Sequence, residues 1–164
     1  MRDNQYLENR LYFLWENYFA DVARKNLVLI KFGKSSSRQL GSIKWANQRT
    51  KINGVLKNKK EEHNIADDKR ISVITITKLF QSEKIPEYII DSTIAHELVH
   101  YTHGFHSPLE RMYNHPHKGN IVGKELIKRG LGDMYKQSKR WLKENWREII
   151  KSQRTTSGFS IFGF

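Results

Sequence analysis

The sequence predicts an α+β fold in which a small antiparallel sheet packs against an N-terminal helix and against helices from the C-terminal half. Two observations support this prediction. Runs of β-branched and alternating apolar residues lie between residues 26 and 80, whereas the segments on both sides carry apolar residues at helical spacing. With 164 residues, the chain is long enough for one hydrophobic core and too short for two comfortable domains.

The N-terminal segment is predicted to be a helix that begins at Asp3 or Asn4 and ends near Arg24. Its apolar side chains recur every three or four residues, so they would form one buried stripe. The stripe consists of Leu7, Leu11, Leu14, Trp15, Tyr18, Phe19 and Val22.

Strands are predicted in NLVLIKF (26–32), LGSIKW (40–45) and ISVITITKLF (71–80). The last of these runs is the richest in β-branched residues, and both of its faces carry side chains that suit partial burial. Residues 57–70 are charged and almost free of large apolar groups, so they are predicted to form a surface loop.

One stretch, IIDSTIAHELVHYTHGFHSP, contains four of the seven histidines of the chain. Pro86 suits the first turn of a helix through this stretch, and Gly104 suits its C-terminal end. On such a helix His96 and His100 project from the same face, one turn apart. Two neutral imidazoles in this arrangement bind one zinc ion, and Glu97 would act as general base toward a water molecule at the metal.

A catalytic zinc ion needs a third protein ligand and an open position, and four histidines are candidates for that ligand. His106 has the spacing of the pattern H-E-x-x-H-x-x-G-x-x-H, but His103 stands where that pattern has its glycine. His103 lies one turn further along the same helical face, where it is poorly placed to complete a tetrahedron. A second helix is predicted to begin at Pro116, with His117 in its first turn and His115 just outside it. We favour His117 over His115, and both over His106.

The composition limits the chemistry and the environment of the protein. The chain has no cysteine, which excludes disulfides, thiol nucleophiles and zinc sites built on cysteine. The net charge of +12 makes acidic partners plausible. No apolar run approaches the roughly 18 residues of a membrane span, and the N-terminus lacks a signal-peptide pattern. We therefore expect a cytoplasmic monomer that does not enter a membrane.

Residues 132–152 are predicted to form an amphipathic helix that packs on the domain of residues 1–131. Its cations recur at three- or four-residue spacing along one face: Lys136, Arg140, Lys143, Arg147 and Lys151. Such a row can follow the phosphates of DNA or RNA, with Trp146 stacked on an unpaired base, although a solvated surface is the more frequent role. Residues 153–164 are predicted to be disordered.

Three segments, VLIKFGKSSSRQLGSIKW, ISVITITKLF…IPEYIIDSTIAHELVHY and HKGNIVGKEL, resemble consecutive parts of the SprT-like metalloprotease domain. They are similar to that family's first strands with their Leu-Gly-Ser step, to its strand and active-site helix, and to its downstream H-G-x-x-F segment. The resemblance covers about residues 5–131. It implies a minimal zincin fold with one zinc ion per chain on His96, His100 and His117, and with Glu97 as the base.

Two features depart from the pattern of this family. Lys118 follows the third histidine where the family has glycine, and Gly119 comes one place later, so His115 stays an alternative ligand. The chain also lacks the cysteine-based zinc ribbon that many members carry. One characterised member cleaves proteins crosslinked to DNA, so the resemblance makes DNA-associated protein substrates plausible.

The sequence thus predicts a zinc metallopeptidase that acts on protein or peptide substrates. An extra donor should stabilise the developing oxyanion, and the candidates are Tyr101, His103, Tyr113 and Arg111. The substrate would add as a strand to a sheet edge, for which residues 71–77 are the candidate. Two alternatives remain: a structural zinc site closed by a fourth ligand such as His103 or His115, and a nucleic-acid-binding protein whose zinc site is not catalytic.

Overall fold

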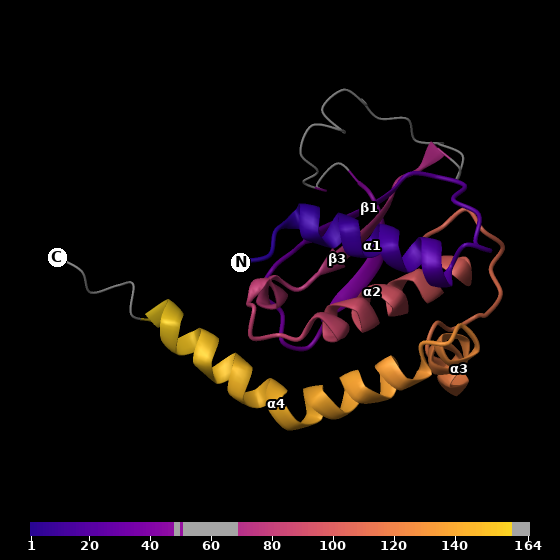
Figure 1. Cartoon of the computed structure of the whole chain (residues 1–164). Helices are drawn as coiled ribbons and strands as arrows, with labels where there is room; N and C mark the ends of the chain where they lie inside the picture. Colours follow the sequence, from indigo (N-terminus) through magenta and orange to yellow (C-terminus); the bar gives the residue numbers. More distant parts are fainter. Residues whose placement is uncertain (48–49, 51–68, 159–164) are drawn as a thin grey trace.

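The computed structural model describes residues 1–47, 50 and 69–158, with side chains described as far as Gln153, and it confirms the α+β class (Figure 1). The elements in chain order are α1 (Asn4–Tyr18), β1 (Val28–Phe32), β2 (Gly41–Trp45), β3 (Ser72–Ile76), the 3₁₀ helix η2 (Lys78–Gln81), α2 (Glu87–Thr102), the 3₁₀ helix η3 (Lys118–Asn120), α3 (Ile121–Lys128) and α4 (Gly132–Gly158). No helix in these described ranges is long and apolar enough to cross a membrane.

The three strands lie in the order β1-β3-β2, with β3 in the centre. β1 pairs parallel to β3, whereas β2 pairs antiparallel to it. The sheet is therefore mixed, and the predicted antiparallel sheet is wrong for one of these two pairs. Side-chain alternation predicts a strand but carries no information on the direction of the neighbouring strand.

The central place of β3 also corrects the predicted substrate edge. Both edges of β3 are occupied by its neighbours, so residues 71–77 have no free ladder of N–H and C=O groups to offer an added strand. Among the described strands, the free edges belong to β1 and β2.

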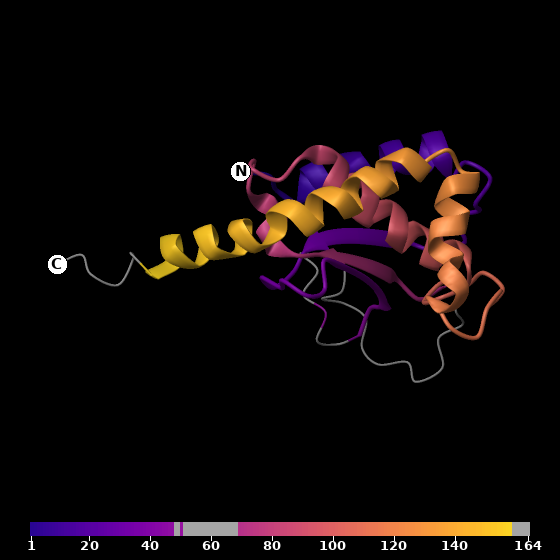
Figure 2. The same ribbon diagram turned by 90° about the horizontal axis from the view of Figure 1, so that it is seen from below.

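Helices α1 and α2 cover one face of the sheet, and α4 runs along the side of the domain next to α2 (Figure 2). Ile30, Ile74 and Ile43 stand side by side across the three strands and are buried. They pack in one core with buried side chains of the helices, among them Leu7, Leu14, Ile90, Ile94 and Leu98. Each such burial contributes about 1.5–3 kcal/mol relative to an exposed side chain. This core fixes α2 against the sheet.

The first helix is shorter than predicted. It ends at Tyr18, and the chain then forms a turn in which the N–H of Val22 donates to the carbonyl of Phe19 (2.9 Å). Phe19 and Val22 are nevertheless buried. The predicted apolar stripe is thus correct, although its last two members lie beyond the helix.

The last helix is longer than predicted, because α4 continues to Gly158. The side chain of Gln153 donates a hydrogen bond to the carbonyl of Leu79 (3.2 Å), which holds this part of α4 on the domain. The predicted disorder is therefore wrong for residues 153–158. Residues 159–164, like most of the predicted loop at 57–70, lie outside the described residues.

A partly buried ion pair joins α1 to α2. Arg10 contacts both carboxylate oxygens of Asp91 at 2.8 and 2.6 Å, and burial raises the pKa of Asp91 even beside this partner. Arg10→Ala would leave the buried carboxylate unpaired, and we expect it to lower the free energy of unfolding in urea by about 3 kcal/mol. The double variant Arg10→Met/Asp91→Leu should regain most of this loss, because it buries no charge. Equal stability of the single and double variants would contradict this account.

Candidate metal centre and its cleft

Helix α2 carries the first two histidines of the candidate metal centre, as the sequence predicts. It begins after Pro86 and ends at Thr102, with Gly104 at a φ of 78° just beyond its end. His96 and His100 lie on the same face of α2, and their ring centroids are 4.7 Å apart. The local spacing alone produces this pair, because residues four apart are neighbours on a helix.

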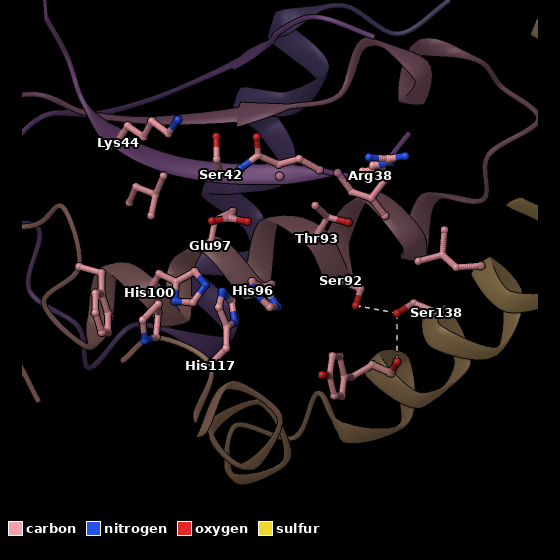
Figure 3. Close-up of a pocket in the computed structure, with 18 of the residues that line it drawn as sticks. Arg38, Ser42, Lys44, Ser92, Thr93, His96, Glu97, His100, His117 and Ser138 are labelled. Atoms are coloured by element: carbon pink, nitrogen blue, oxygen red, sulfur yellow. Dashed lines mark hydrogen bonds between the residues drawn. The ribbon is translucent and has the colours of Figure 1, made fainter. Parts of the chain in front are cut away.

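The third histidine comes from a separate segment of the chain. The ring of His117 lies 5.4 Å from that of His96 and 4.7 Å from that of His100, measured between centroids. One nitrogen from each of these three rings lies within 4.8 Å of the others (Figure 3). His115 and His103 do not belong to this group, nor does any carboxylate in the part of the chain that the structure describes.

The backbone around His117 differs from the prediction. His117 does not lie in the first turn of a helix but caps the short helix η3. The chain then turns into α3 through two residues in the left-handed region, Gly119 (φ 71°) and Asn120 (φ 54°). Glycine adopts this conformation without strain, and asparagine tolerates it better than most residues. Gly119 and Asn120 therefore supply the turn that leads from His117 into α3.

The electrostatics of the three-histidine cluster favour neutral imidazoles. Burial, followed by the charge of His117 and of Lys139, lowers the pKa of His96 to about 4. Burial and the neighbouring histidines lower the pKa of His100 to about 3. Both rings are therefore unprotonated at neutral pH, which is the form that binds a metal ion.

The three histidines lie close enough to bind a metal ion. Small rotations of the rings can bring their nitrogens to bonds of about 2.1 Å from one shared ion. Within the described ranges the group has three members, so such an ion would keep at least one position open. The buried Nδ1 of His100 also has no hydrogen-bond partner. Buried polar atoms are usually paired, so this nitrogen is consistent with a ligand site.

Glu97 lies between the histidines and β2 (Figure 3). Its side chain is buried, and burial raises its pKa to about 8, although the backbone N–H of Ile43 donates a hydrogen bond to it. This is a carboxyl group that changes its charge near neutral pH, directly beside three metal-binding side chains. A proton acceptor of this kind suits general base chemistry.

Strand β2 approaches α2 so closely at Gly41 that a side chain would collide there. A Cβ atom on Gly41 would lie 2.7 Å from Oε1 of Glu97 and 2.8 Å from Cγ2 of Thr93. This glycine belongs to the Leu-Gly-Ser step of the sequence. Its physical role is to leave room for the carboxylate of Glu97.

We therefore expect Gly41→Ala to displace the carboxylate of Glu97 without removing a metal ligand. A displacement of about 1 Å at a catalytic group typically costs about 100-fold in rate. If the centre hydrolyses peptides, as proposed below, the expected result is a loss of that activity by this factor with unchanged metal content, measured on the same preparation. Ser42→Ala is the matched control, because Ser42 points away from Glu97 (Figure 3); equal activity in both variants would contradict this role of Gly41.

The histidines and Glu97 line a cleft of about 520 Å³ between β2, α2 and the beginning of α4. None of the four oxyanion candidates lines it. Tyr101 is fully buried, and its hydroxyl donates to Oδ1 of Asn26 at 2.8 Å. His103 is buried against Tyr113, with 4.8 Å between ring centroids. Arg111 lies over the ring of Phe105.

Other polar residues of the cleft were not singled out from the sequence. Arg38 precedes β2, Lys44 lies within it, and Tyr135 and Lys139 come from the first turns of α4. The predicted row of cations on the last helix does not include Lys139. Which of these cations faces the cleft depends on how α4 docks, and the sequence does not encode that docking in any short pattern.

The cations predicted to contact nucleic acid are all exposed on α4: Lys136, Arg140, Lys143, Arg147 and Lys151. Lys151 also pairs with Glu148 at 3.1 Å. The ring of Trp146 packs edge-on against Phe80, and its Nε1 donates to the carbonyl of Ser37 at 2.9 Å. This side chain thus attaches α4 to the domain, which argues against the predicted stacking on a base.

Comparisons of the chain with models of protein families, with curated proteins and with solved structures give no match.

Proposed function

We propose that the protein is a zinc-dependent metallopeptidase, in which Glu97 is the general base and His96, His100 and His117 hold the metal. The observation that carries the proposal is the position of Glu97, a buried carboxyl group with a pKa raised to about 8 beside three converging imidazoles. The resemblance to the SprT-like domain supports the same assignment. A purely structural zinc site has four closed protein ligands, and only three such residues converge in the described part of the chain.

Zinc is the metal that an all-imidazole site favours among the abundant divalent ions without redox chemistry. A bound zinc ion would lower the pKa of a water molecule to about 7 and polarise the carbonyl of the substrate. Glu97 takes the proton from the attacking water and then delivers it to the nitrogen of the leaving amine. The N–H of Ile43 orients the carboxylate for both transfers.

The substrate is proposed to bind as an added strand along β2. The hydrogen bonds from Thr77 to Leu40 and from Ala46 to Ile71, both 2.8 Å, define which residues of β2 bond to β3. In an antiparallel pair such residues alternate, so the backbone groups of Ile43 point to the free edge instead, where the N–H serves Glu97 and the C=O is the group left for an added strand. This agrees with the bond from Ile43 to Glu97. An extended peptide on this edge would lie directly beside the metal centre.

The test is a comparison of the wild-type chain with His96→Ala. The wild type, stripped with a chelator and reloaded, is expected to bind one zinc ion and to digest casein, and His96→Ala is expected to do neither. Digestion should stop with chelator and return with zinc. A zinc-loaded wild type that leaves casein and unfolded peptides intact, with and without single-stranded DNA, would refute the proposal.

A second candidate function is nucleic-acid binding with a zinc site that does not catalyse. It is favoured by the exposed cations of α4, which follow one another over four turns. Electrostatic binding of this kind weakens steeply with salt. Lys143→Glu/Arg147→Glu should then abolish the binding of single-stranded DNA, whereas Glu97→Gln should not affect it. A shallow salt dependence would identify these cations as ordinary solvated surface.

A further inference from the structure

The charges that line the cleft are strongly unbalanced. Arg38, Lys44 and Lys139 line it together with the histidines, and Glu97 is the only carboxylate among its described lining residues. None of the three cations forms an ion pair within the described ranges. Glu97 is buried and bound to Ile43, so it does not neutralise them.

Two of these cations frame the end of the cleft that lies between β2 and α4. Arg38 belongs to the segment that leads into β2, whereas Lys139 belongs to α4 on the opposite wall. Thr93, Ser92 and Ser138 follow one another from Glu97 toward this end (Figure 3). Ser92 lies one turn of α2 before His96, so this end of the cleft adjoins the three histidines.

The wall between these cations is polar, neutral and fixed. Oγ of Ser138 lies 2.8 Å from Oγ of Ser92 and donates to the carbonyl of Tyr135 at 3.0 Å. Ser92 must then donate to Ser138, so the two hydroxyls use their protons on each other and on the backbone. The amino group of Lys139 stands over the ring of Tyr135, 4.5 Å from its centroid. The serine pair joins α2 to α4 and so sets the width of this end of the cleft.

We propose that this end of the cleft, between Arg38 and Lys139, is a specificity subsite for an acidic side chain of the polypeptide substrate. The inference rests on the proposed peptidase function and names the class of substrate. A strand added to β2 would direct every second side chain toward the face of the sheet that the helices cover. An aspartate or glutamate there would meet two exposed cations that form no ion pair in the described ranges.

The first experiment measures binding, which does not depend on turnover. Fluorescent peptides that differ only by Glu, Gln or Lys at each position around one cleavable bond are titrated into zinc-loaded Glu97→Gln protein at low ionic strength. At one position, the Glu peptide is expected to bind about fivefold more tightly than the Gln peptide, which is the upper range for exposed charge pairs. The Lys peptide should bind more weakly than both. Equal affinities at every position would overturn the inference.

The second experiment tests whether Lys139 and Arg38 cause the preference for the Glu peptide. Lys139→Glu and Arg38→Glu, each made in the Glu97→Gln background, are expected to abolish the preference for Glu and to favour the Lys peptide. Lys124→Glu is the matched control, because it changes the net charge equally from an exposed position on α3 outside the cleft. A similar loss in the control would assign the effect to the net charge of the protein and would overturn the subsite.

The same peptides separate this inference from the proposed function. In the wild-type protein, kcat/KM should be about fivefold higher for the Glu peptide than for the Gln peptide. The single variant Lys139→Glu should lose this difference. If no peptide is cleaved but the Glu peptide still binds selectively, the peptidase proposal fails and the subsite stands. If all peptides are cleaved equally well, the subsite fails and the peptidase proposal stands.

Discussion

Glu97→Gln is expected to lower peptide hydrolysis by about 10²–10⁴-fold, the range over which general bases act, and to leave zinc binding intact. Glutamine has nearly the shape of glutamate and can fill the same buried space, but its amide does not take up a proton at neutral pH. The metal content should not change, because the converging ligand atoms belong to His96, His100 and His117. The measurement is kcat/KM on a fluorogenic peptide together with zinc stoichiometry.

Glu97→Gln is also expected to change the stability of the metal-free protein. The carboxyl group of Glu97 has its pKa raised from 4.5 to about 8 in the folded state. Between these two pH values the unfolded chain loses this proton while the folded chain keeps it, so the contribution of Glu97 to stability falls as the pH rises. Glutamine has no such proton, so Glu97→Gln should stabilise the metal-free protein by about 4 kcal/mol at pH 7.5, since each pKa unit is worth about 1.4 kcal/mol.

This gain should vanish well below pH 4.5, where the carboxyl group is protonated in both states. It should also shrink in the zinc-loaded protein, where the positive ion favours the carboxylate. Thermal unfolding with chelator and with zinc, at several pH values, checks both statements. Unchanged hydrolysis in Glu97→Gln would remove Glu97 from the mechanism, whatever the stability data.

His117→Ala is expected to weaken zinc binding by more than about 100-fold, because loss of a mere hydrogen-bond partner of a metal ligand already costs 10–100-fold. His115→Ala is an unusually close control, two residues away in the same exposed segment. Since His115 lies outside the three-histidine cluster, its removal should leave zinc affinity within about twofold. Competition with a zinc-binding dye measures both affinities.

The pair of variants also decides between the two ligands that the sequence left open. If His115→Ala loses zinc and His117→Ala keeps it, the segment must rearrange around the ion, and the site described above is not the one used. Circular dichroism should be unchanged in both variants, because neither side chain contributes to the hydrophobic core.

The sequence predicts best what is local. The pairing of His96 with His100 follows from helical spacing, and the helix itself follows from Pro86, Gly104 and the apolar residues between them. The choice of His117 rested on a helix predicted to begin at Pro116, and the resemblance implied the same ligand, whereas the structure leads from His117 into α3 through a turn at Gly119 and Asn120. No periodic pattern signals such a turn.

The side chains that line the cleft come from segments far apart in the sequence, and the sequence predicted them less well. Strand direction and strand order are set by the packing of the whole domain, so the central place of β3 could not be read from its own residues. The four predicted oxyanion donors were chosen by their nearness to the motif along the chain. The side chains that do line the cleft, such as Arg38 and Lys139, come from segments far from it in sequence.

The position of Ile43 has a consequence for how this protein can vary. Its amide holds the carboxylate of Glu97, and its edge of β2 is the one on which we propose that substrates align. Alignment and proton transfer would then share one stretch of main chain, and of the replacements at position 43 only proline would delete its N–H. Homologous proteins could exchange the side chains around it and acquire new targets while the reactive geometry stays the same.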